Sequence, residues 1–229
     1  RRPVIWGKRG TCSLGFDSRM QRFVLFIFLL LSVCPALTRS QDSSLKGHSL
    51  SYGFVVDNSG SFRLLMERVI KLVNFVADKN ADGDEAFLLT FVDPQKTRVR
   101  QELTSNKAEL REATENMYVE GGLSSILDAV RLSIDYLTAN VQNRADKKLA
   151  LILISDGDEP VSPAKMDAVI MAAKEANIRI LVVGMSDEKV NSKFLDRLAK
   201  GTGGIAFYPR TTKETEAVAE SVASALRGK

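Results

Sequence analysis

The sequence predicts an α/β fold in which a mainly parallel, six-stranded sheet of the doubly wound, Rossmann-like type carries helices on both faces. Apolar strand-like runs alternate along the chain with helical stretches, which is typical of parallel βαβ units. The run at 149–155 is apolar almost without interruption, as expected for a strand buried on both faces. The connection at 93–96 is too short for a parallel crossover, so it predicts one antiparallel strand.

Six segments have the length of strands, and five of them are apolar. They lie at 51–56, 86–92, 97–103, 149–155, 179–185 and 205–208. The segment at 97–103 is the antiparallel one. It is charged, and we expect its arginine and glutamate side chains to block further pairing at an edge of the sheet.

Apolar residues at helical spacing and capping residues indicate the helices. The helix after 51–56 is expected to bury one stripe, formed by Phe62, Met66, Val69, Val73 and Val76. Another begins after Ser125, where apolar residues recur at Ile126, Val130, Ile134 and Leu137. Ser162 and Pro163 predict a later helix start, and Gly201 predicts a helix end. Thr211 and Glu214 have the spacing of a capping box for the last helix.

The first 40 residues differ in character from the rest. Met20 and Arg22 precede an apolar run at 23–33, which is followed by small and polar residues, the pattern of a signal peptide at 20–40. The run is shorter than the roughly 20 residues that span a bilayer, so no stable membrane span is expected after cleavage. We interpret residues 1–19 as upstream sequence or a mis-assigned start, 41–49 as a linker and 50–227 as one domain. The predicted location is secreted, periplasmic or in the cell envelope.

Removing this leader changes the charge of the chain. The whole sequence has a net charge of +4, but residues 1–40 hold seven bases and one acid, which leaves 25 bases and 27 acids. The remaining domain is slightly acidic, and no basic stripe with interleaved aromatic residues indicates nucleic-acid binding. Both cysteines, Cys12 and Cys34, lie in the leader, so the domain needs no disulfide.

Three turns in the predicted domain carry oxygen ligands for a hard cation. Asp57, Ser59 and Ser61 follow the first strand, Asp156 follows the strand at 149–155, and Ser124 precedes a helix. One loop offering a carboxylate and two neutral hydroxyls suits Mg²⁺, with Mn²⁺ as an alternative. The structural alternative is that the first loop is an Asx-type turn, that Ser124 caps its helix and that Asp156 accepts from backbone amides. Three such turns together favour the metal site.

Topology supports their convergence. In doubly wound sheets, ligands bind beyond the carboxyl ends of the strands, at the point where the winding reverses. Asp57 and Asp156 both end strands. If these strands are neighbours at that point, the two acids and the Ser124 loop meet at one place.

The chain resembles the von Willebrand factor A (VWA) domains, whose metal-ion-dependent adhesion site combines a D-x-S-x-S loop, a threonine and a second aspartate. Asp57, Ser59 and Ser61 match the first motif, and Asp156 matches the second acid. A serine replaces the threonine, and either Ser124 or Ser125 aligns with it. The resemblance covers roughly residues 50–226 and is greatest to a secreted bacterial VWFA-related subgroup.

The resemblance implies a monomeric, extracytoplasmic protein-binding domain. In it, Mg²⁺ captures an Asp or Glu of a protein partner. Ser59, Ser61 and Ser124 act as direct or near-direct ligands, while Asp57 and Asp156 balance the charge, partly through water. The alternative is a structural or accessory subunit of an envelope complex, in which the metal only stabilises the loops.

An enzymatic role is not expected. A Ser-His-Asp mechanism needs a histidine near the nucleophile, and the sole histidine, His48, lies in the predicted linker. Zinc chemistry lacks its usual His and Cys ligands in the predicted domain. No general base is visible beyond the metal loops, which argues against a Mg²⁺-dependent hydrolase.

Overall fold

The computed structural model describes residues 48–228, so the predicted leader and most of the linker lie outside the described residues. The sheet has six strands in the order β3-β2-β1-β4-β5-β6. Their bounds are Ser49–Asp57 (β1), Glu85–Phe91 (β2), Arg98–Thr104 (β3), Lys147–Ser155 (β4), Ile178–Gly184 (β5) and Ala206–Phe207 (β6). Strand β3 is an edge strand antiparallel to β2, and the other pairings are parallel, which confirms the predicted sheet.

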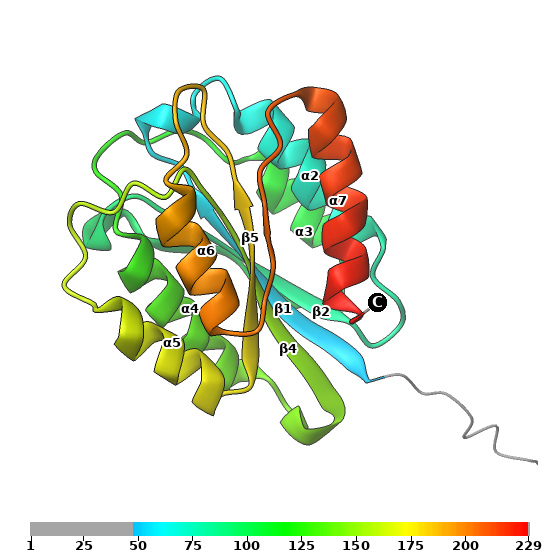
Figure 1. Ribbon diagram of the computed structural model, residues 1–229. Coiled ribbons are helices and arrows are strands. Elements are labelled where there is room, and N and C mark those ends of the chain that lie inside the picture. The colour runs from blue at the N-terminus through cyan, green and yellow to red at the C-terminus, as the bar shows by residue number, and fades with distance from the viewer. Residues whose placement is uncertain (1–47, 229) are drawn as a thin grey trace, which may run out of the picture. The chain divides into compact units, whose positions relative to one another are not determined.

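Helices cover both faces of this sheet, as predicted (Figure 1). Their bounds are Met66–Asp78 (α2), Lys107–Glu115 (α3), Ile126–Asn140 (α4), Met166–Glu175 (α5), Ser192–Gly201 (α6) and Thr212–Leu226 (α7). Helices α2, α3 and α7 pack on one face, and α4, α5 and α6 pack on the other. None of these helices is both long and apolar enough to cross a membrane.

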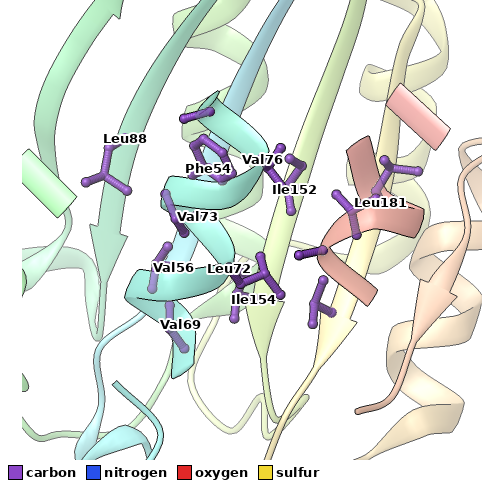
Figure 2. Close-up of a cluster of buried hydrophobic side chains, with 14 of the residues drawn as sticks. Phe54, Val56, Val69, Leu72, Val73, Val76, Leu88, Ile152, Ile154 and Leu181 are labelled. Carbon is purple, nitrogen blue, oxygen red and sulfur yellow. The ribbon is translucent and has the colours of Figure 1, made fainter. Parts of the chain in front are cut away.

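Helix α2 packs on the face of the sheet that it shares with α3 and α7 (Figure 2). Its Val69 and Val73 lie against Phe54 and Val56 of β1, and all four side chains are fully buried. The whole stripe predicted for this helix is buried, with Phe62 contributed by a short 3₁₀ turn before α2. The described residues 48–228 lie in one compact unit with a core on each face of the sheet, so a segment from residue 46 to the end is expected to fold without the preceding residues.

The capping predictions were right for two helices and wrong for one. Helix α6 ends at Gly201, and Thr211 caps α7 by accepting from the Glu214 amide. Helix α5, however, begins at Met166, so Pro163 is not in its first turn. Ser162 instead bonds to helix α4, where its hydroxyl accepts a hydrogen bond from the Asp128 amide in the first turn.

Candidate metal centre

The predicted site residues lie where the winding of the sheet reverses. Strand β1 has β2 as its neighbour on one side and β4 on the other. The pairing of β1 with β4 is parallel, so both strands end at the same edge of the sheet. Their register pairs Val56 with Ile154, which brings Asp57 and Ser155 to the same level at the carboxyl ends. The predicted convergence of these strand ends is therefore confirmed.

The carboxylate of Asp57 is the centre of the site. It is fully buried and accepts hydrogen bonds from the Ser59 amide at 3.0 Å and from two hydroxyls. The Ser124 hydroxyl lies 3.0 Å from Oδ2 and 3.2 Å from Oδ1, and the Ser155 hydroxyl lies 3.0 Å from Oδ2. All of these donors are neutral, so the carboxylate is solvated by dipoles without a balancing positive charge.

Burial is the main cause that raises the pKa of Asp57 to about 6. The negative charge of Asp156 acts in the same direction. Hydrogen bonds from Ser59 and Ser124 act in the opposite direction but do not cancel the effect of burial. The ionised carboxylate is therefore costly in the metal-free fold, and a neighbouring cation would stabilise it.

The first loop presents its two hydroxyls side by side. The Ser59 and Ser61 Oγ atoms are 3.1 Å apart, with Ser59 buried and Ser61 exposed. Ser61 lies in the 3₁₀ turn Gly60–Phe62, directly before the residues that lead into α2. This short turn brings alternate hydroxyls of the loop to the same side, next to Asp57.

The structure distinguishes Ser124 from Ser125. Ser124 donates to the Asp57 carboxylate, whereas the Ser125 hydroxyl and amide both bond to the Val92 carbonyl. Ser125 precedes helix α4 but makes no side-chain cap. Ser124 therefore faces the site, and neither serine has the helix-capping role that was the structural alternative.

Asp156 closes the other side of the site. It is buried, and its Oδ1 accepts from the Asp158 amide at 3.0 Å, so the structural role considered from the sequence is present here. Asp156 also lines an open groove of about 980 Å³ together with Ser61 and the segment 186–193. Asp156 thus acts electrostatically on Asp57 and also lines the open groove.

Two residues of the site were missed by the sequence analysis. Ser155 donates to Asp57 and accepts from the Gly157 amide. Asn58 is fully buried and binds the loop that carries Ser124, through its carbonyl to the Glu120 amide and through its own amide to the Tyr118 carbonyl. Both residues could have been found from the sequence, because each is polar and lies directly beside an acid at the end of a strand: Asn58 follows Asp57, and Ser155 precedes Asp156.

The residues present fit a hard divalent cation. All five predicted side chains offer oxygen, and two of them are carboxylates. Among residues 48–228, no Lys or Arg side chain forms an ion pair with Asp57 or Asp156. The described part of the chain holds no group of three or more His, Cys, Asp or Glu residues arranged for a metal. The candidate site instead combines three hydroxyls with two carboxylates.

Comparison with known proteins agrees with this architecture. The sequence model of the family described as von Willebrand factor type A domain matches residues 53–221 of this chain. No curated relative matches the sequence.

Several solved structures share the fold at low sequence identity. BatB, a conserved hypothetical protein from Bacteroides thetaiotaomicron, is 16% identical with a TM-score of 0.65, over 79% of this chain and 100% of that one. The pilus adhesin SpaC from Lactobacillus rhamnosus GG is 15% identical with a TM-score of 0.61, over 80% and 30%. Proximal thread matrix protein 1 from the mussel byssus, with a zinc-occupied MIDAS motif, is 15% identical with a TM-score of 0.66, over 76% and 47%.

Proposed function

The chain belongs to the von Willebrand factor type A domain family, and from this membership we propose that it is an extracytoplasmic, Mg²⁺-dependent protein-binding domain. Domains of this family are generally interaction modules without catalytic activity. In the proposed site, Asp57, Ser59, Ser61, Ser124 and Asp156 hold the metal. When bound, the metal supplies an electrophilic position that accepts a carboxylate from the partner.

The observation that carries this proposal is the buried carboxylate of Asp57, which only neutral groups contact among the described residues. A buried charge without an opposite charge is unfavourable, and here a second acid increases the cost. Function explains the arrangement better than stability does, because uncharged residues would pack this position more favourably. Neutral hydroxyl ligands also leave a bound divalent ion with residual positive charge.

The groove beside the site supports a protein partner. Leu64, three residues after Ser61, lines it with 77% of its surface exposed. Arg63, Lys189 and Lys193 line it beside the acids Asp158, Asp187 and Glu188, and none of the three cations makes an ion pair within the described residues. A partner that places an acid at the metal would cover Leu64 and these cations with its flanking residues.

Metal titration tests the proposal directly. We expect the 46–229 segment to bind one Mg²⁺ or Mn²⁺ per chain by isothermal titration calorimetry, because Ser59 and Ser124 bond to the Asp57 carboxylate and the Ser61 hydroxyl lies beside that of Ser59. Saturating metal at about 100 times Kd should stabilise the fold by about 2.7 kcal/mol. Absence of both heat and stabilisation would refute the metal site. Metal binding with partner capture that persists in EDTA would favour the structural or accessory role.

Export is a separate prediction and rests on residues 20–40. We propose that the chain is translocated and cleaved between Pro35 and Gln41, because the apolar run at 23–33 is followed by small and polar residues. Mass spectrometry of the mature N-terminus, after expression in a host that exports the protein, measures the cleavage point. A product that keeps Met20 and remains in the membrane fraction would contradict cleavage and indicate a signal anchor.

A further inference from the structure

Ser124 lies on a loop whose two glycines leave the backbone little restricted. The loop between α3 and α4 contains Gly121 and Gly122, with φ angles of 69° and 138°. Glycine adopts such angles without steric cost and restricts the chain little. A side chain at Gly122 would place its Cβ 2.6 Å from Val92. The distance from Ser124 to Asp57 must therefore be set by contacts elsewhere on the loop.

The first of these contacts is made by Asn58, which lies between two residues of the proposed metal site. Its backbone amide donates to the Phe91 carbonyl at 3.0 Å, and its carbonyl accepts from the Glu120 amide at 2.9 Å. Its side-chain amide donates to the Tyr118 carbonyl at 3.1 Å. Asn58 thus connects the Asp57 loop to the segment just before the two glycines.

The second contact comes from the edge strand. Arg100 of β3 forms an ion pair with Glu120, and its Nε donates to the Thr90 hydroxyl at 2.8 Å. The Arg100 guanidinium also lies 4.9 Å from the centre of the Tyr118 ring. The side chains of Arg100 and Glu120 are only 23% and 17% exposed, so this pair is screened less by water than a surface ion pair is.

This arrangement corrects the expectation for one charge of the edge strand. From the sequence, the arginines of 97–103 were expected to block pairing with another chain. Arg98 fits an exposed role, since it bonds only to the nearby Gln95 and Thr97 carbonyls. Arg100 instead reaches inward to Glu120, because Thr90 and Tyr118 hold its guanidinium in place.

We infer that Arg100 and Glu120 are positioning residues for the metal centre, an inference that rests on the proposed metal-binding function. The ion pair fixes Glu120, the Glu120 amide bonds to Asn58, and the glycine-containing segment then places Ser124 against Asp57. Neither residue touches the proposed ligands themselves. They would increase metal affinity by holding the Ser124 loop in its binding geometry in the metal-free protein.

The far half of the loop is held independently. Lys96 donates to the Gly121 carbonyl at 2.9 Å, and the Ser125 amide donates to the Val92 carbonyl at 2.7 Å. Breaking the Arg100–Glu120 pair should therefore loosen the loop without unfolding it. This separation makes a loss of metal affinity distinguishable from a general loss of structure.

The experiment compares Mg²⁺ affinity in Arg100→Met, Glu120→Gln and the double variant of the 46–229 segment. We expect about tenfold weaker binding in each single variant, the lower end of the effect of removing a direct partner of a metal ligand, because Arg100 and Glu120 act through Asn58 and the loop. The double variant should be no worse than either single one, because both break the same connection. Arg98→Met is the matched control, and its affinity should stay within about twofold of the wild type.

Two further readouts separate positioning from stability. Hydrogen exchange at the Glu120 amide should be faster in Arg100→Met, and Arg100→Lys, which keeps the charge, should recover part of the Mg²⁺ affinity. Variants that unfold at lower temperature but bind Mg²⁺ like the wild type would overturn the inference while leaving the proposed function intact. A wild-type segment that binds no Mg²⁺ would overturn both.

Discussion

Replacing Asp57 with asparagine is expected to weaken Mg²⁺ binding by at least about tenfold and to stabilise the metal-free domain at pH 7. Affinity falls because the site loses one of its two carboxylates. Stability rises because asparagine fills the same space without a buried charge. The hydroxyls of Ser124 and Ser155 rotate freely enough to bond to either side-chain atom of the amide.

The gain in stability should depend on pH in a defined way. In the unfolded chain the pKa of an aspartate is about 3.9, whereas burial raises the pKa of Asp57 to about 6 in the fold. Below about pH 4 the carboxyl group is protonated in both states and carries no penalty. The penalty grows between the two pKa values and is complete above about pH 6, where it reaches about 3 kcal/mol.

Thermal unfolding in EDTA at pH 4 and pH 7 measures this difference. Asp57→Asn should be clearly more stable than the wild type at pH 7 and nearly equal to it at pH 4. Asp158→Asn is the control, because Asp158 is an exposed acid lining the same groove. If the metal-free wild type is as stable as Asp57→Asn at pH 7, burial of the ionised Asp57 carboxylate does not destabilise the fold.

The sequence carried enough information to predict the sheet and three of its loops. Strand β4 is apolar from Leu149 to Ile154, so its burial on both faces could be predicted from composition. Parallel strands end at the same edge, which predicts that Asp57 and Asp156 approach each other. The four-residue connection 93–96 likewise required β3 to run antiparallel.

The remaining features depend on contacts between segments far apart in the chain. The part played by Ser155 follows from the register of β1 and β4, which a strand pattern does not specify. The choice between Ser124 and Ser125 follows from the bonds of Ser124 to Asp57 and of Ser125 to the Val92 carbonyl. The inward path of Arg100 depends on Glu120, 20 residues further along the chain. Single-segment patterns contain none of this information.

An acidic residue of the partner is expected to dominate binding to the Mg²⁺-loaded domain. Truncating it should cost 2 kcal/mol or more, which is about a 30-fold loss of affinity. The reason is that the three proposed hydroxyl ligands are neutral and the two carboxylates act partly through water, so the ion keeps positive charge and its open position favours an anionic oxygen. An isosteric amide keeps the shape of the acid but loses that charge.

Short peptides measure this preference without an identified partner. In Mg²⁺, an Ac-Gly-Asp-Gly-NH₂ peptide should shift the amide resonances of Ser61 and Asp156, which line the groove, whereas its asparagine counterpart should not. EDTA should abolish the shifts because it removes the metal, and Asp57→Asn should reduce them at limiting Mg²⁺ because it weakens metal binding. Acetate at high concentration should compete, since it offers the same carboxylate. Equal shifts from both peptides, or shifts that persist in EDTA, would place the interface away from Asp57, with the groove around Leu64 and the helical faces as the surfaces to test next.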